Sequence, residues 1–529
     1  MVRVRRIAVG VAVLLAAGLG ARSQQGPRAP FEIRHIVAHG QRIDTQFYDF
    51  TGDGVLDALV VSIDWDVEPR VRWLALHIGR KGEGIPEKPD QIWPAAPFAC
   101  ALALGNVVPE GGVDILEIAP DGVYYHAFEN GVMTEEPRKL IHTRTFFTTP
   151  SDRALPTWSK PVDLSKDGLD DLVIPVPDGY KVYFQTAPGR FGTVVRLEAD
   201  LAPGKTPAIS PRRFAADWER ALARGLPPSS SLFNIYDELP RITPVDINGD
   251  GLLDLVSIRG DEMTIFFQKA GLQFPAALRK THKIATLREE RRKDTVDVAD
   301  VQFCDINGDG IMDFVVTKIE GQLGFMKSIK TRIYPHLGTG RGNFQGDTCI
   351  IIDGVSLNPV FLDMDGDGAL DVLTSRLRTD ILEQAVSAGL FGDITVTYEV
   401  FQFDKVQNSY LNAPVFSYDV RIPIDDMKNM GAGSRPLFQV ARDMSGDGRP
   451  DAVIYVPKTA TVEVRRGRVA WRDNGTRRVI DFEKDVAASF VIDKKNPPKW
   501  MSFLDIDGDG RQDVILDYNG LVKILLSRF

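Results

Sequence analysis

The chain has 529 residues, 43% of them hydrophobic and 26% charged, which excludes a disordered polymer and allows a large buried core. Its formal net charge is −9, from 63 basic and 72 acidic residues, so we expect no nucleic acid as a partner. The three cysteines, Cys100, Cys304 and Cys349, lack zinc-ligand spacing, and we expect buried free thiols rather than a disulfide framework.

The N-terminus has the layout of a secretory signal peptide. A basic start over residues 3–6 precedes an apolar run over 7–19, and small residues continue to Ser23. We expect residues 1–23 to be cleaved and the mature chain to be secreted or to lie in the periplasm or cell envelope; an uncleaved anchor is the alternative. No later segment reaches about 18 uninterrupted apolar residues, so no membrane span is expected after cleavage.

One nine-residue pattern, Asp-x-(Asp/Asn/Ser/Thr)-x-Asp-Gly-x-x-Asp, then recurs along the chain. Its seven copies begin at Asp49, Asp163, Asp246, Asp305, Asp363, Asp443 and Asp505. Short apolar runs flank most copies, as residues 301–304 and 314–316 flank the fourth. Apolar runs on both sides of a Gly-containing turn predict two strands joined by a loop.

The spacing within each copy suits calcium, which takes six to eight oxygen ligands. Side chains at positions one, three, five and nine can converge, position seven can offer its backbone carbonyl, and the glycine at position six allows a sharp bend. A metal-free turn is the alternative for a single copy, but the shared register of all copies favours about seven calcium ions. The expected ligands are Asp49, Thr51, Asp53, Val55 and Asp57; Asp163, Ser165, Asp167, Leu169 and Asp171; Asp246, Asn248, Asp250, Leu252 and Asp254; Asp305, Asn307, Asp309, Ile311 and Asp313; Asp363, Asp365, Asp367, Ala369 and Asp371; Asp443, Ser445, Asp447, Arg449 and Asp451; and Asp505, Asp507, Asp509, Arg511 and Asp513.

The EF-hand begins with a similar pattern, but it needs a bidentate Glu at position twelve and a helix on each side. Position twelve here holds residues such as Val60, Ser257 and Leu516, and the flanks are rich in β-branched residues. The sequence therefore excludes EF-hands.

A degenerate eighth copy, Asn106–Asp114, lies midway in the long gap between the first two copies. It has Val108 at position three and Glu110 at position five, so we expect it to bind calcium weakly or not at all. Eight units of about 60 residues predict an all-β protein, a β-propeller of about eight blades with small helical insertions. Seven blades is the alternative.

The two chain ends are predicted to close the ring. After Asp505, strands are expected around 514–516 and 521–526, and Phe31–Val37 would supply the missing outer strand of the last blade. Residues 31–529 are thus expected to form a calcium-binding β-propeller closed by N- and C-terminal strands.

The motif and the apolar strand after it resemble the FG-GAP/VCBS repeats of bacterial exported proteins and, distantly, the integrin α-subunit propeller. The resemblance implies calcium in the loop that joins the first two strands of each blade, at one face of the ring. The Phe-Gly…Gly-Ala-Pro cassette of the integrin version is not readable here, which makes the VCBS group the closer resemblance.

Three insertions interrupt the repeats. Helices are expected over 212–226 and 380–390, and an added strand pair within 378–436. The third insertion, between Lys458 and Trp500, carries the hairpin signal Asn474-Gly475 and six arginines around Trp471. We favour a solvated edge hairpin there over a basic ribbon for an anionic glycan or phosphate surface.

No catalytic motif is readable: the seven histidines are scattered, and no Gly-x-Ser-x-Gly or phosphate-binding loop is present. We therefore expect a non-enzymatic scaffold, extracellular or periplasmic, that binds a protein or glycan partner. The alternative is a polysaccharide lyase on a calcium-stabilised propeller, which would need Lys, Arg, Tyr or His side chains converging at the central channel.

Overall fold

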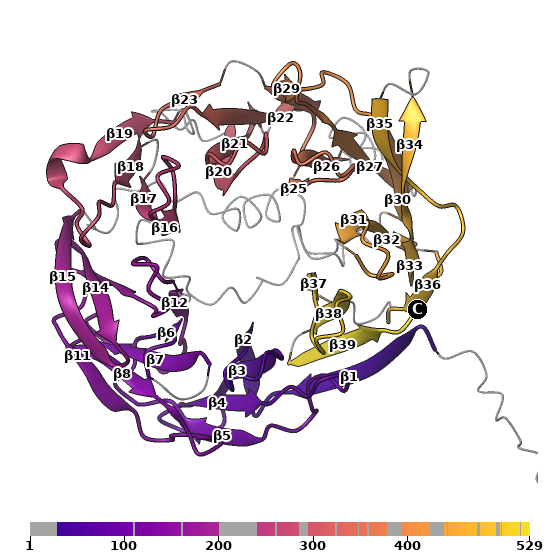
Figure 1. Cartoon of the computed structure of the whole chain (residues 1–529). Coiled ribbons are helices and arrows are strands. Elements are labelled where there is room, and N and C mark those ends of the chain that lie inside the picture. Colours follow the sequence, from indigo (N-terminus) through magenta and orange to yellow (C-terminus); the bar gives the residue numbers. More distant parts are fainter. Residues whose placement is uncertain are drawn as a thin grey trace, which may run out of the picture.

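The computed structural model is an eight-bladed β-propeller (Figure 1). It describes residues 29–199 and 241–529, apart from gaps at 109–111, 160–161, 260–261, 285–294, 323–324, 347–348, 357–358, 378–392, 424–437, 442, 457, 473–476, 494–497, 499 and 519. The predicted signal peptide lies outside the described residues. Eight blades are confirmed, and the seven-blade alternative is wrong because the degenerate copy has a full blade of its own.

The first four blades follow chain order, each numbered from the ring axis outward. Blade 1 contains β2 (Gln41–Tyr48), β3 (Asp57–Asp64), β4 (Val71–His77) and β5 (Gln91–Pro94); blade 2 contains β6 (Ala101–Gly105), β7 (Asp114–Ala119), β8 (Gly122–His126) and β11 (Arg138–His142). Blade 3 contains β13 (Leu172–Val176), β14 (Gly179–Ala187) and β15 (Arg190–Glu198); blade 4 contains β16 (Arg241–Val245), β17 (Asp254–Arg259), β18 (Glu262–Phe266) and β19 (Lys280–Lys283). Strand β12 (Thr157–Ser159) precedes β13 but pairs in parallel with β6, so it joins blades 2 and 3.

The remaining blades repeat the same antiparallel order. Blade 5 contains β20 (Thr295–Cys304), β21 (Asp313–Gln322), β22 (Phe325–Gly338) and β24 (Ile350–Asp353), with β23 (Phe344–Gln345) on the end of β22; blade 6 contains β25 (Val360–Leu362), β26 (Asp371–Leu377), β27 (Asp393–Phe401) and β30 (Phe416–Pro423). Blade 7 contains β31 (Phe438–Ala441), β32 (Asp451–Val456), β33 (Thr461–Arg465) and β36 (Ala488–Val491); blade 8 contains β37 (Trp500–Leu504), β38 (Asp513–Tyr518), β39 (Leu521–Ser527) and β1 (Phe31–Val37).

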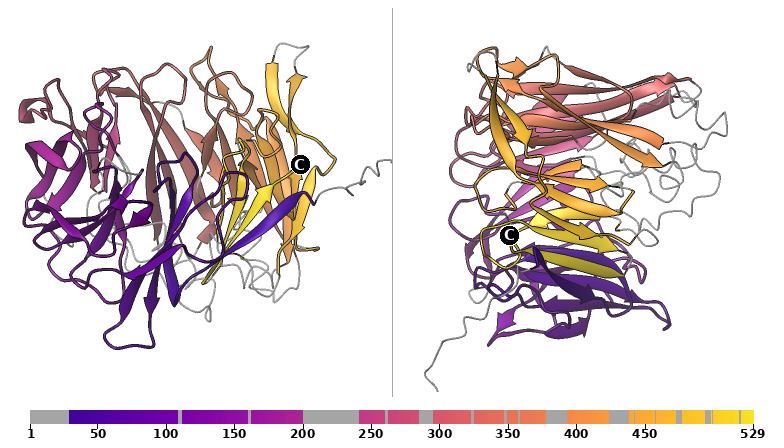
Figure 2. Two further views of the ribbon diagram at one scale, coloured as in Figure 1. Left: turned by 60° about the horizontal axis from the view of Figure 1, so that its bottom comes forward. Right: turned by 90° about the vertical axis from the view of Figure 1, so that its right-hand side faces the viewer.

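Strand β1 closes the ring, as the sequence predicts. It pairs antiparallel with β39 from Phe31 opposite Ser527 to Val37 opposite Leu521. The two strands come from opposite ends of the described chain and lie side by side in Figures 1 and 2. This pairing covers the edge of β39 and joins the two ends of the described chain within one blade.

The core lies between neighbouring blades. In β3 the run from Ala58 to Ile63 is fully buried, because one face packs on blade 2 and the other on blade 8. Leu59 belongs to a cluster with Leu102 and Ile115 of blade 2, whereas Val60 belongs to one with Ile515 and Ile524 of blade 8. Burial on both faces explains why these second strands read as continuous apolar runs without alternation.

The prediction of small helical insertions is wrong. Within the described part of the chain the one helical element is the 3-10 helix η2 (Ala276–Leu278), and the two segments with helix-like sequences, 212–226 and 380–390, lie outside it. The described inserts are hairpins: β9–β10 (Phe128–Glu129 and Val132–Met133), β28–β29 (Phe403–Asp404 and Ser409–Tyr410) and β34–β35 (Gly467–Arg472 and Arg477–Phe482). Each has short paired runs on either side of a turn, as in β28–β29, where Phe403 and Tyr410 are buried with ring centroids 5.1 Å apart.

The cysteines are free thiols. Cys100 is buried, and Cys304 and Cys349 are half-buried. Full burial is confirmed for Cys100, and burial raises the pKa of its thiol to about 11.

Candidate metal-binding loops

All seven Asp-rich copies lie at equivalent places in the ring. In six blades the copy joins the first strand to the second, as Asp49–Asp57 joins β2 to β3 and Asp505–Asp513 joins β37 to β38; in blade 3 it lies between β12, which pairs with β6 of blade 2, and β13. Because the blades repeat one strand order around the ring, the loops open at one face. The strands that flank the loops are those that the sequence predicts.

The carboxylate at position one curls each loop. In blade 8, Asp505 Oδ1 accepts hydrogen bonds from the backbone N–H groups of Gly508 (2.9 Å) and Asp509 (3.1 Å), and Oδ2 accepts one from Gly510 (2.9 Å). Gly508 and Gly510 have φ angles of 71° and 89°, a region in which a side chain is disfavoured. The bonds to positions five and six recur in all seven copies.

The carboxylate at position five bends the second half of the loop. Its Oδ1 accepts the N–H of position seven in every copy, at 2.9 Å between Asp509 and Arg511. One oxygen of the position-five carboxylate is thus held by a backbone N–H group, and the second oxygen can face a bound ion.

The carboxylate at position nine is buried and ties the loop to the blade. Asp57 Oδ2 accepts the N–H groups of Phe50 (2.8 Å) and Thr51 (3.1 Å), and its Oδ1 accepts that of Gly79 (2.8 Å), just beyond β4. The equivalent Oδ1 bonds come from Gln185, Gln268, Gly338, Phe403, Gly467 and Ser527. Burial raises the pKa of this group, to about 7 for Asp254 and about 8 for Asp371.

Sequence reasoning missed this bridging role, because the motif suggests only a ligand at position nine. A signal was available: each of these residues directly precedes an apolar run that becomes a fully buried strand. The ligand role of position nine stays a prediction.

Two loops gather carboxylates closely enough for one cation. Asp363, Asp365 and Asp367 each place an oxygen within 4.8 Å of the others, and so do Asp505, Asp507 and Asp513. These are the two copies in which the sequence predicts four carboxylate ligands.

Unsatisfied buried oxygens test whether these loops fit calcium. Asp507, at position three, is fully buried; its Oδ1 has no hydrogen-bond partner, and its Oδ2 lies 2.6 Å from Arg528 Nη1. Ser445 Oγ, at the same position in blade 7, is also buried without a partner. Buried polar oxygens normally have partners, and calcium prefers oxygens of this kind. The residues present therefore fit the ion.

The remaining copies carry neutral oxygens at position three. Thr51 Oγ1 lies 3.3 Å from Asp49 Oδ1, and Ser165 Oγ lies 3.3 Å from Asp163 Oδ1, so positions one and three do converge. In the degenerate copy, Glu110 lies outside the described residues. Asp114 there accepts the N–H groups of Val107 (2.8 Å) and Val108 (2.9 Å) and keeps the bridging role without the ligand set.

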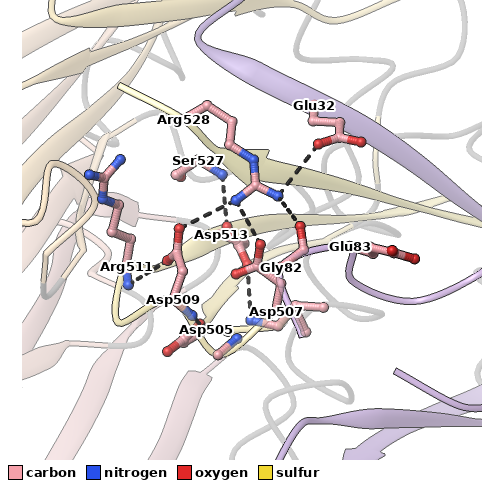
Figure 3. A network of polar contacts seen from close by, with 12 residues as sticks. Glu32, Gly82, Glu83, Asp505, Asp507, Asp509, Arg511, Asp513, Ser527 and Arg528 are labelled. Carbon is pink, nitrogen blue, oxygen red and sulfur yellow. Dashed lines mark hydrogen bonds and ion pairs between the residues drawn. The ribbon is translucent and has the colours of Figure 1, made fainter. Parts of the chain in front are cut away.

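Basic side chains approach several of the loops. Lys269 Nζ lies 3.6 Å from Asp250 Oδ2, and Lys405 Nζ lies 3.1 Å from the Asp367 carbonyl oxygen. In blade 8, Arg528 reaches over the loop toward Asp507 and Asp509 (Figure 3).

Residues 246–316 and 305–374 match the model of the FG-GAP-like repeat. Residues 246–374 thus contain FG-GAP-like repeats. The matched segment spans the third, fourth and fifth Asp-rich loops in chain order, which begin at Asp246, Asp305 and Asp363. The finer resemblance to VCBS repeats and to integrins stays a prediction. No curated protein matches the sequence.

Solved structures with similarity to this chain include one from Toxoplasma gondii and one from Drosophila. The WD40 domain of Toxoplasma gondii coronin is 9% identical, with a TM-score of 0.35 over 94% of this chain and 87% of that one. Drosophila semaphorin 1b, extracellular domains 1–2, is 10% identical, with a TM-score of 0.33 over 94% and 88%. Scores this low support no inference about the chain. Within the described residues, no helix is both long and apolar enough to span a bilayer.

Proposed function

We propose that the protein is a non-enzymatic, calcium-stabilised propeller scaffold, outside the cytoplasm, that binds a protein or glycan partner. The observation that carries the calcium part is Asp507, a fully buried carboxylate whose Oδ1 has no hydrogen-bond partner, inside a loop of further carboxylates. Such crowded carboxylates repel one another unless a cation joins them.

The expected location agrees with the loop chemistry. Several copies combine carboxylates with neutral Thr, Ser or Asn oxygens, and fewer charged ligands give weaker calcium binding. Weak sites fill only at the roughly millimolar calcium typical of extracellular modules. The FG-GAP-like repeats and the predicted signal peptide support the same location.

The loop face and the inserted hairpin β34–β35 are the candidate partner surfaces. Trp471 on β34 is 61% exposed, and the hairpin lies at the periphery of the ring in Figure 1. Inserts that do not carry the fold are free to carry recognition. The lyase alternative needs side chains that converge at the ring axis, and it stays a prediction.

The test is calcium content. After equilibration in millimolar calcium we expect about seven ions per chain, and Asp367→Ala should lose one of them. Asp353→Ala, in which an exposed Asp outside the loops is replaced, is the matched control and should lose none. Calcium at a hundredfold excess over its Kd should add roughly 2.7 kcal/mol of stability per site, so a chelator should lower the melting temperature. One ion or none by elemental analysis would contradict the proposal.

A further inference from the structure

The loop of blade 8 lies where the ring closes, and the residue after β39 spans that joint. The backbone N–H of Arg528 donates to the carbonyl oxygen of Pro30 at 2.9 Å, just before β1. Its side chain then turns back over the loop Asp505–Asp513 (Figure 3).

The Arg528 guanidinium contacts three parts of the ring at once. Nη1 lies 2.6 Å from Asp507 Oδ2 and 3.3 Å from Asp509 Oδ2 in the loop. Nη2 donates to the Gly82 carbonyl oxygen of blade 1 at 3.0 Å and lies 3.4 Å from Glu32 Oε2 on β1. The side chain is 17% exposed, so water screens these contacts only in part.

Arg528 neutralises the charge of Asp507 but leaves one of its two carboxylate oxygens without a hydrogen-bond partner. The guanidinium contacts Oδ2 alone, at 2.6 Å, and Oδ1 has no hydrogen-bond partner. In blade 6 the corresponding Asp365 accepts a hydrogen bond from a neutral donor, the Gln402 side-chain amide, at 2.6 Å. The blade 8 loop thus differs in holding a fixed positive charge against two of its expected ligands.

We propose that Arg528 competes with calcium for the blade 8 loop and links ion binding there to closure of the ring. An ion bound by Asp507 and Asp509 would lie close to the guanidinium, and the two cations repel. Calcium must therefore displace the side chain, which breaks its contacts with Gly82 and Glu32. This inference rests on the proposed calcium binding.

The experiment is calcium titration by calorimetry of Arg528→Gln and Arg528→Met, the latter keeping an apolar stem in case the former fails to fold. We expect one site to bind about tenfold more tightly in either variant, since a unit positive charge has left the loop. Arg34→Gln is the matched control, because Arg34 on β1 lies 2.5 Å from Glu32 Oε1 and donates to the Glu83 carbonyl oxygen at 3.1 Å, so a charge is lost at the same joint but not beside Asp507 or Asp509. Its effect should be smaller. When Asp505→Asn has already removed an expected ligand of this site, Arg528→Gln should give no gain in calcium affinity.

A second readout tests the link to closure. Without calcium, the melting temperature of Arg528→Gln should be lower than that of the wild type. Adding calcium should raise the melting temperature of the variant by more than it raises that of the wild type.

If the wild type binds calcium and both Arg528 variants titrate identically to it, or more weakly, the competition is refuted and the proposed function stands. If no form binds calcium, both fail. If only the Arg528 variants gain an ion, the competition holds and general calcium loading fails.

Discussion

Aspartates in these loops divide into two kinds by their surroundings. At position five the side chain holds one backbone N–H at the solvent-facing turn, as Asp167 accepts from Leu169 at 3.0 Å. At position nine it is buried, and Asp171 accepts three N–H groups, from Leu164, Ser165 and Gln185, at 2.8–2.9 Å. The same residue type therefore ties the loop to the blade at position nine, whereas at position five it is left free to serve the proposed ion binding.

Substitutions at these two positions separate the roles. Asp171→Ala leaves buried N–H groups without an acceptor, at about 1–3 kcal/mol each, so it should destabilise the protein with or without calcium. Asp167→Ala should lose stability in calcium and change little in chelator. Urea unfolding of both variants under the two conditions measures this. Equal losses in chelator would show that position five is as structural as position nine.

At the scale of elements, the degenerate loop Asn106–Asp114 shows what remains when the ligand set is missing. Asp114 keeps its bonds to Val107 and Val108, and Asp170 of the next loop accepts the N–H of Asn106 at 2.6 Å. Burial, with a smaller contribution from the Asp170 charge, raises the pKa of Asp114 from 3.8 to about 7. The carboxylate at the start of β7 therefore still holds the first residues of this loop, Val107 and Val108.

This loop predicts a pH dependence. The raised pKa means that folded Asp114 binds its proton more tightly than the unfolded chain does, so its contribution to stability is greatest below pH 4 and falls as the pH rises to about 7. Asp114→Asn keeps an acceptor oxygen and cannot ionise. From pH 5 to pH 8, in chelator, the variant should gain stability relative to the wild type, by on the order of a few kcal/mol. A difference in unfolding free energy that does not change with pH would contradict the assignment.

The sequence predicts correctly those strands and turns that form because of the residues within them. The apolar runs beside six of the motifs become the first two strands of a blade, and Asn474-Gly475 lies between β34 and β35 in the sequence. Helical insertions were a wrong prediction because a 3.6-residue apolar period is a weak guide in polar inserts, and the described inserts pair across turns. The parallel bridge of β12 to β6 and the approach of Arg528 to Asp507 depend on residues far apart in sequence, which no local pattern encodes.

At the scale of the molecule, ring closure depends on one strand. On β1, Phe31 and Ile36 are buried, and all seven residues pair with β39. A chain that begins at residue 38 would leave β39 as an unpaired edge and expose its apolar side chains. Compared with a control chain that begins at residue 29, it should melt at a lower temperature and form oligomers in size-exclusion chromatography. Equal melting and a monomeric profile would show that closure is not needed.

The pairing of β1 with β39 also sets an order of events during biosynthesis. Roughly 480 residues separate the two strands, and a ribosome adds about 5–20 residues per second, so β1 waits on the order of 25–100 s for its partner to be made. During that interval β1, with its apolar side chains exposed, can pair with the wrong strand of the same chain or of a neighbouring chain. The last blade can therefore form only after β39 has been translated, and we expect a holding chaperone to raise the yield of folded chain.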